Sequence, residues 1–147
     1  MAQIIVPITT DKMEQCIELY INVFNSEPWN ETWTYQAAKE LLADLIQTPK
    51  FLGFLLYDDG ELVGLIAGNS KKTYTESTFY LAELCINNRM QGKGYGSKLL
   101  LSLEEELKER GIQSLYFLTA KNGPAEAFYI KNEYVINENR IVMKKSL

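Results

Sequence analysis

The residues best suited to chemistry form a glycine-rich turn, Gln91-Gly92-Lys93-Gly94-Tyr95-Gly96-Ser97, between an apolar strand-like segment and a leucine-striped helix. Backbone N–H groups without intrahelical partners and the positive end of the helix dipole converge at such a helix N-terminus. The glycines carry no Cβ that would keep a diphosphate away from those donors, and Lys93, with Arg89 or Lys98, adds positive charge. The turn therefore predicts a local anion site, and a turn without any ligand is the alternative.

Two common phosphate-binding motifs do not fit this turn. A P-loop has Gly-Lys followed directly by Ser or Thr, whereas this helix opens with Gly96-Ser97-Lys98. The dinucleotide fingerprint has the spacing G-x-G-x-x-G, whereas the glycines here follow G-x-G-x-G. ATP chemistry and a nicotinamide or flavin cofactor are therefore disfavoured.

The turn resembles the acetyl-CoA signature of the GNAT-type N-acetyltransferases, Gln/Arg-x-x-Gly-x-Gly/Ala, which Gln91 to Gly96 match at every specified position. A second family element, an Asn followed by a helix with Ala and Tyr, is similar to Asn122 and residues 125–131. The resemblance is strong over residues 79–134 and looser before them. The chain departs from the family at Glu133, where Gly is common. A Glu in a left-handed cap costs on the order of 1 kcal/mol relative to Gly, which allows a different local turn there.

The resemblance implies acetyl-CoA as the co-substrate, without a metal. It implies that the backbone of the turn holds the CoA diphosphate and that Asn122 binds the pantetheine or its adjoining groups. It also implies a sheet that splays between the strand ending at Ile86 and the strand ending at Thr119, so that pantetheine pairs with exposed strand edges. The expected cofactor-binding residues are Leu84, Cys85, Ile86, Gln91, Gly92, Lys93, Gly94, Tyr95, Gly96, Ser97, Asn122 and Tyr129.

Acetyl transfer to an amine needs a base, an acid and stabilisation of the carbonyl oxygen. Glu83 is an isolated carboxylate in an apolar strand and is the candidate base, with an ion-paired or exposed edge residue as the alternative. Tyr129 resembles the family tyrosine that protonates the departing thiolate, with core packing beside Phe128 as the alternative. Backbone N–H groups of residues 84–86 are candidate oxyanion donors. A covalent acetyl-Cys85 is disfavoured because no histidine is present to activate the thiol.

The acceptor is expected to be a primary amine of a small molecule or peptide. The loop from Glu27 to Trp33 combines carboxylates with both tryptophans, which suits an alkylammonium through charge and cation–π contact. Two tryptophans that clamp two helices together are the alternative. The expected acceptor-side residues are Glu27, Trp29, Trp33, Tyr80 and Glu83. A catalytically silent acyl-CoA-binding sensor or interaction module is the alternative function.

Composition limits the remaining choices. A chain of 147 residues with 46% hydrophobic and 23% charged residues fits a single domain, 1–147. The absence of histidine excludes His-based triads and His-containing zinc sites. The formal net charge of -4 argues against a nucleic-acid partner, and no apolar run suits a membrane helix. A cytoplasmic setting is the default, and the oligomeric state stays open, with a homodimer among the alternatives.

Several segments must position these residues. Hydrophobic periodicity and turn residues predict an α/β fold with a mixed, mostly antiparallel central sheet of about six to seven strands, splayed in the middle, with helices on both faces, which is the acyl-CoA N-acyltransferase fold. Expected strands are Gln3 to Ile8, Phe51 to Tyr57, Leu62 to Gly68, Thr78 to Ile86, Leu115 to Thr119, and a closing hairpin of Tyr134 to Ile136 with Ile141 to Lys144. Expected helices begin near Asp11, after Thr34, after the glycine turn and at Pro124.

Overall fold

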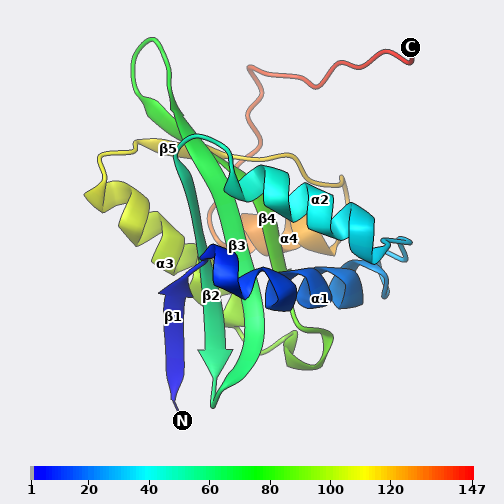
Figure 1. Cartoon of the computed structure of the whole chain (residues 1–147). Coiled ribbons are helices and arrows are strands. Elements are labelled where there is room, and N and C mark those ends of the chain that lie inside the picture. The colour runs from blue at the N-terminus through cyan, green and yellow to red at the C-terminus, as the bar shows by residue number, and fades with distance from the viewer. Residues whose placement is uncertain (1) are drawn as a thin grey trace. The chain divides into compact units, whose positions relative to one another are not determined.

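The computed structural model describes residues 2–147 and separates them into two compact units, one ending at Phe117 and the other spanning Leu118–Leu147. The helices and strands follow one another along the chain as labelled in Figure 1. Their bounds are β1 (Gln3–Pro7), a 3-10 turn (Thr10–Lys12), α1 (Met13–Phe24), α2 (Tyr35–Ile46), β2 (Phe51–Asp58), β3 (Glu61–Lys72), β4 (Ser77–Ile86), a second 3-10 turn η2 (Asn88–Met90), α3 (Tyr95–Glu109), β5 (Ser114–Tyr116) and α4 (Pro124–Lys131). No helix of residues 2–147 has the length and apolarity needed to cross a bilayer.

The first unit contains a mixed sheet in the order β1-β2-β3-β4-β5. The first three strand pairs are antiparallel and β4 pairs with β5 in parallel. This confirms the predicted α/β class and the mostly antiparallel sheet. The sheet has five strands instead of the predicted six to seven.

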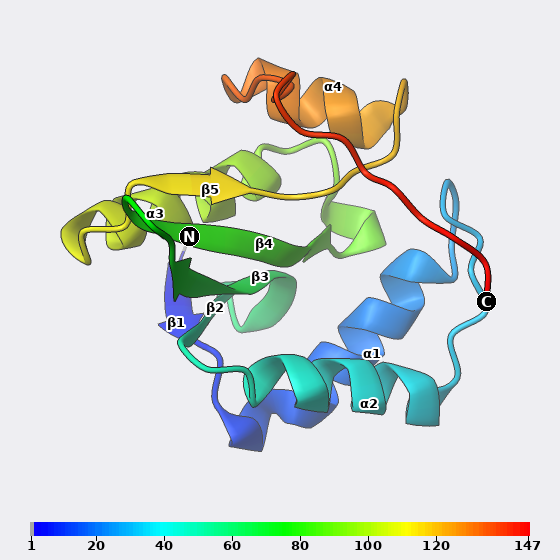
Figure 2. The ribbon, with the colours of Figure 1, turned by 90° about the horizontal axis from the view of Figure 1, so that it is seen from above.

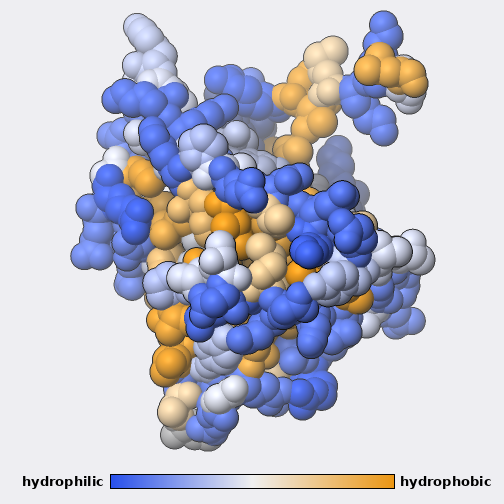
Figure 3. Space-filling view, in the orientation of Figure 1, coloured by the Kyte–Doolittle hydropathy of each residue, from blue (hydrophilic) through white to orange (hydrophobic). Residues whose placement is uncertain are grey.

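Helices cover both faces of this sheet, as the view from above shows (Figure 2). Cys16 and Ile17 of α1 pack with Leu55 of β2, Leu65 of β3 and Cys85 of β4 in one buried cluster. α3 lies on the opposite face and buries its leucine stripe there. Hydrophilic side chains predominate over the outer surfaces of α1 and α2 in the space-filling view, as amphipathic helices require (Figure 3).

Local sequence signals set the helix ends. The Thr34 side chain accepts a hydrogen bond of 3.1 Å from the Ala37 amide and caps α2. Gly111 follows α3 with φ 76, and the Ile112 amide bonds the Leu107 carbonyl at 2.9 Å, which closes a left-handed C-terminal cap. Both predicted caps are therefore confirmed.

In the second unit, α4 begins with a proline, and Glu126 accepts a hydrogen bond of 2.6 Å from the Asn122 amide. Glu133 after this helix has φ 73, so the left-handed cap forms with Glu in place of Gly. The predicted hairpin of residues 134–136 and 141–144 is wrong, because neither segment is a strand. The apolar side chains Val135 and Ile141 are 87% and 80% exposed. An apolar β-prone segment forms a strand only with a partner edge and a surface to pack on, and neither segment has a strand partner within the described residues.

The sheet splays between β4 and β5. Their pairing ends at Tyr80 with Tyr116, whereas β4 continues to Ile86. The predicted strand at residues 115–119 is shorter than expected, because β5 ends at Tyr116. Residues 81–86 of β4 are therefore beyond the register with β5, which confirms the predicted splay.

β4 also carries a β-bulge directly before Glu83. Ala67 pairs with Glu83 and Gly68 pairs with Leu81, so the intervening Ala82 is the extra residue. A bulge shifts the alternation of side chains and turns the following residues to the other face. The bulge therefore decides which helix layer Glu83 faces.

The positions of two other β4 residues show this change of face. Phe79 lines a cavity together with Leu52 and Ile112, whereas Cys85 belongs to the buried cluster under α1 and α2. These two residues are an even number of positions apart and would share a face of an unbroken strand. Because Glu83 and Cys85 follow the bulge and are two apart, Glu83 faces α1.

The close approach of β3 to this bulge requires glycine at position 68. A Cβ there would lie 2.0 Å from the Tyr80 carbonyl oxygen and 2.7 Å from the Phe79 ring. We expect Gly68→Ala to lower the free energy of unfolding by about 2 kcal/mol, because the backbone must move to relieve the overlap. Urea unfolding measures the change. Gly123→Ala is the matched control, since its added methyl would lie 4.0 Å from the Lys121 carbonyl oxygen. Equal losses in both variants contradict the prediction.

Candidate active site

The glycine turn begins α3 in a conformation that favours glycine. Gly92 has φ 78 and Gly94, the N-cap of α3, has φ 87. A Cβ added to either residue would meet no other atom within 4 Å, so open space adjoins both. The first helical hydrogen bond runs from the Lys98 amide to the Gly94 carbonyl at 3.1 Å. The amides of the first turn of α3 therefore remain donors for an anion, and the turn fits a diphosphate.

Hydrogen bonds hold the segment before the glycines against β4 and α1. Gln91 donates to the Ile86 carbonyl at 3.0 Å and to the Asn88 side chain at 3.3 Å. Asn88 donates to the Asn22 carbonyl and to the Ser26 hydroxyl, both at 3.0 Å. The Gln91 side chain therefore positions the turn and occupies the last carbonyl of β4.

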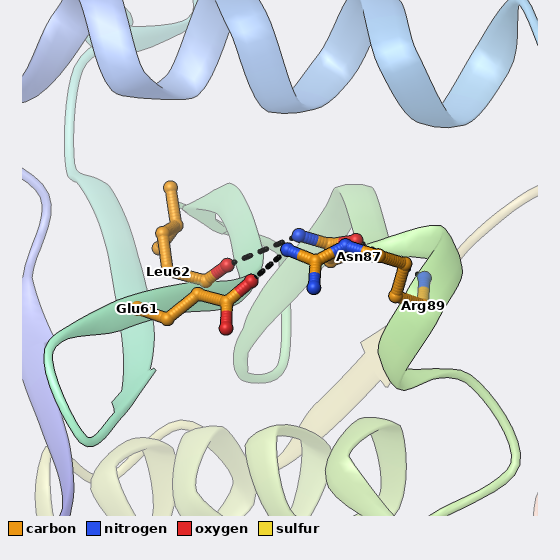
Figure 4. Close-up of polar contacts among 4 residues, drawn as sticks. All are labelled: Glu61, Leu62, Asn87 and Arg89. Carbon is orange, nitrogen blue, oxygen red and sulfur yellow. Dashed lines mark hydrogen bonds and ion pairs between the residues drawn. The ribbon is translucent and has the colours of Figure 1, made fainter.

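The β2–β3 turn holds the same segment from another side (Figure 4). Arg89 forms an ion pair with Glu61, and Asn87 donates to the Leu62 carbonyl at 3.5 Å. Lys98 is likewise bonded, to the Gln3 side chain. Of the three cations that the sequence places near the turn, Lys93 alone makes no side-chain ion pair or hydrogen bond within residues 2–147.

Glu83 is a mostly buried carboxyl on the part of β4 that has left β5. Burial raises the pKa of Glu83 from 4.5 to about 7, and the negative charge of Glu31 adds to the rise. A hydrogen bond from the Tyr20 hydroxyl opposes the rise by stabilising the carboxylate. Tyr20 itself is buried on α1, and its own pKa is raised. Glu83 is thus a carboxyl that changes charge near neutral pH.

Aromatic side chains surround this carboxyl. The Tyr20 and Trp33 rings meet edge to face with centroids 5.1 Å apart, and the Trp33 indole donates to Glu31 at 2.6 Å. Tyr80 and Tyr116, the last pair before the splay, have ring centroids 5.2 Å apart. Burial and the charge of Glu83 raise the pKa of Tyr80. The site therefore combines two carboxyl groups with aromatic faces.

The structure joins some of the expected acceptor residues and separates others. Trp33 and Tyr80 share this cluster with Glu83. Trp29 instead packs on Phe24 with centroids 5.5 Å apart, and Glu27 is exposed. Both tryptophans contact aromatic residues of α1, Trp33 on Tyr20 and Trp29 on Phe24.

The cysteine on β4 is unsuited to act as a nucleophile. Cys85 is buried, and its burial with the charge of Glu83 raises the pKa of its thiol well above the ordinary value. Its neighbours Leu84 and Ile86 are half-buried on the same splayed segment. The backbone of this segment therefore remains the part that can contact a ligand.

Asn122 and Tyr129 belong to the second unit. Asn122 adopts φ 60 just before α4. The Tyr129 ring meets the rings of Phe128 and Tyr134 at centroid distances of 5.1 Å and 5.8 Å. The roles expected of these residues therefore continue to rest on the resemblance.

Three residues of the cluster were not predicted as site residues: Tyr20, Glu31 and Tyr116. Tyr20 lies on the buried stripe of α1, where periodicity indicates only core packing. Glu31 could have been found from its place in the loop between the two tryptophans. Tyr116 becomes visible only once its strand is paired with β4, because the pairing puts it beside Tyr80.

The chain belongs to the acetyltransferase (GNAT) family, whose model matches residues 13–134. A search of curated protein sequences found no match.

Solved structures with this fold cover the whole chain. A GNAT family acetyltransferase from Staphylococcus aureus has a TM-score of 0.76 and 17% identity, with 100% of both chains covered. An aminoglycoside acetyltransferase from an uncultured soil metagenomic sample has a TM-score of 0.75 and 19% identity, with 99% of this chain and 96% of that chain covered. A possible acetyltransferase from Clostridium difficile 630 has a TM-score of 0.84 and 11% identity, with 100% of this chain and 99% of that chain covered. At these identities the likeness concerns the fold.

Tyr20 and Glu31 shift the pKa of Glu83 in opposite directions, which allows a paired test. Tyr20→Phe removes the donor that stabilises the carboxylate, so the pKa of Glu83 should rise. Glu31→Gln removes a nearby negative charge, so the pKa of Glu83 should fall. Carbon-detected NMR titration of the glutamate carboxyls measures both. Shifts of the same sign in the two variants contradict this arrangement.

Proposed function

We propose that the chain transfers the acetyl group of acetyl-CoA to a primary amine of a small molecule or peptide, by direct attack while both substrates are bound. Acetyl-CoA supplies the activated acyl group as a thioester. The glycine turn supports this because its open left-handed backbone and helix N-terminus suit a diphosphate. Residues 81–86 of β4, beyond the register with β5, suit the pantetheine as an added strand.

The observation that carries the proposal is the burial of the Glu83 carboxyl on the part of β4 that no longer pairs with β5, which raises its pKa to about 7. An alkylammonium with a pKa of about 10.4 is mostly protonated at pH 7 and must lose a proton before it can attack a carbonyl. Glu83, with a pKa of about 7, takes that proton directly or through a water molecule. A carboxyl with its ordinary pKa would be a much weaker base.

Other groups of the chain supply the remaining steps. Backbone amides of residues 84–86 stabilise the negative charge that develops on the carbonyl oxygen. Tyr129 donates a proton to the departing thiolate, which a phenol with a reference pKa of about 10 can do. The assignment of Tyr129 rests on the family resemblance, and that of the amides on their position on β4 beyond its pairing with β5.

The surroundings of Glu83 favour a cationic acceptor. Glu31 and Glu83 attract an ammonium group, and the faces of Trp33 and Tyr80 add cation–π contact. The name of one solved relative, an aminoglycoside acetyltransferase, describes an acceptor of this charge. Polyamines and aminoglycosides are therefore the first acceptors to examine.

The direct test is thiol release from acetyl-CoA in the presence of a panel of primary amines. We expect turnover with at least one amine, and kcat/KM should rise as pH passes through about 7, because Glu83 must be deprotonated to act. Glu83→Gln should lower kcat about 100-fold and remove that pH dependence. Glu18→Gln, an exposed residue of α1, is the matched control. CoA binding without turnover across the panel favours the acyl-CoA sensor, and an unchanged pH profile in Glu83→Gln moves the base role elsewhere.

The acid role of Tyr129 has a separate test. Tyr129→Phe should lower kcat about tenfold or more under conditions where chemistry limits the rate, because the thiolate then leaves without its proton donor. Affinity for acetyl-CoA, measured by calorimetry, should change less than about twofold. Tyr134→Phe loses the same hydroxyl from a ring neighbour of Tyr129 and is the control. Equal kcat in both variants excludes the acid role.

A further inference from the structure

The glycine turn is attached on both sides to one acidic turn, that between β2 and β3. Before the glycines, Arg89 forms its ion pair with Glu61 (Figure 4). After Gly92 and Gly94, the Tyr95 hydroxyl donates a hydrogen bond of 2.5 Å to Asp58. The backbone adds a third link, since the Asn87 amide donates to the Val63 carbonyl at 2.7 Å.

The Asp58 end of this connection is buried. Asp58 is 8% exposed, and its Oδ1 has no hydrogen-bond partner within residues 2–147, so the Tyr95 hydroxyl is the side-chain donor to its other oxygen. Removing a partner from a buried carboxylate leaves its desolvation uncompensated. The Asp58–Tyr95 bond therefore holds the first residue of α3 firmly to the end of β2.

The turn needs such anchors because of its glycines. Glycine has more backbone freedom than any other residue, so ordering Gly92 and Gly94 in left-handed conformations costs more entropy than ordering other residues. An anion binds more tightly to donors that are already in place before it arrives. Anchors on both flanks lower that ordering cost without touching the anion.

The acidic charges of the β2–β3 turn lie beside a site proposed to bind an anion, which simple electrostatics would disfavour. Asp58, Asp59 and Glu61 are acidic residues beside a site that suits a diphosphate, and long-range repulsion alone predicts that they weaken its binding. Glu61 is instead paired with Arg89, and Asp58 with Tyr95. Asp59 differs from both, since its side chain accepts a hydrogen bond from the Ala2 amide.

We propose that Asp58 and Glu61 are positioning residues for CoA binding, acting through Tyr95 and Arg89 on the glycine turn. This rests on the proposed function, because it assigns the diphosphate of CoA to that turn. It reverses the sign expected from charge alone: loss of a negative charge at Glu61 weakens the binding of an anion. The effect is confined to ligands that carry the diphosphate.

The test compares two variants that lose the same charge, and it compares an acyl donor that carries the diphosphate with one that lacks it. Calorimetry gives the Kd of CoA, and thiol release gives kcat/KM for acetyl-CoA and for S-acetylpantetheine, which lacks the diphosphate. Glu61→Gln should weaken CoA binding about two- to fivefold. Tyr95→Phe should weaken it about five- to tenfold. Asp59→Asn removes the same charge from the same turn and should leave Kd unchanged or slightly lower.

The acyl donor without the diphosphate, S-acetylpantetheine, distinguishes a loss of positioning at the turn from a general loss of activity. For Glu61→Gln, kcat/KM should fall with acetyl-CoA and stay unchanged with S-acetylpantetheine. Equal losses with both donors, or none with either, overturn the proposal. Tighter CoA binding by Glu61→Gln also overturns it, because Glu61 would then only compete with the diphosphate for Arg89. Glu61 is partly exposed, so this variant stays informative if Tyr95→Phe unfolds.

Failure of the proposed function gives a different result. If the wild-type chain shows no saturable binding of CoA, the assignment of the diphosphate to the turn is wrong, and the positioning proposal falls with it. If the wild-type chain binds CoA and the variants behave like Asp59→Asn, the positioning proposal alone is wrong.

Discussion

The site depends on the burial of one carboxyl group, that of Glu83. A strand residue at this place would ordinarily be apolar, because removing a carboxylate from water is costly. Two features make the burial tolerable. The pKa rises to about 7, so the group can remain neutral, and Tyr20 donates a hydrogen bond to the charged form. Glu31 acts in the opposite sense and keeps the pKa high. The protonation of Glu83 is thus set by a balance between one hydrogen bond, one charge and the surrounding core.

β4 connects this carboxyl to the proposed anion site in a single continuous segment. The bulge at Ala82 turns Glu83 toward α1, and the same strand then leads through Ile86 into the glycine turn. Gln91 bonds back to the Ile86 carbonyl, so the turn is fixed to the strand that carries the carboxyl. A ligand bound by its diphosphate at the turn would therefore extend along a strand edge whose pairing with β5 has already ended.

The sequence predicts the parts of this fold that local chemistry determines. The Thr34 cap, the Gly111 cap and the helical spacing of the leucines on α3 all depend on neighbours within a few residues. The splay was predicted only through the family resemblance and the bulge was not predicted, because both depend on pairing between strands far apart in sequence. The hairpin at residues 134–144 fails for the same reason: its apolar pattern is present, but these residues pair with none of the described strands. Tyr20 was missed because a buried helix face gives no sign of the side chain opposite it.

The raised pKa of Glu83 makes the stability of the fold and the proposed activity change in opposite directions as pH rises. The folded state holds its proton up to about pH 7, whereas an unfolded glutamate loses it near 4.5. Between these values the folded state binds more protons, so its stability from this group is complete below about pH 4.5 and falls as pH rises toward and through 7. The proposed base function requires the charged form, which exists above that range. The tyrosine bond to Glu83 serves both demands, since it lowers the cost of the charged state while leaving the pKa close to neutrality. A stronger donor in place of Tyr20 would stabilise the carboxylate further but return its pKa toward 4.5, which would make Glu83 a weaker base.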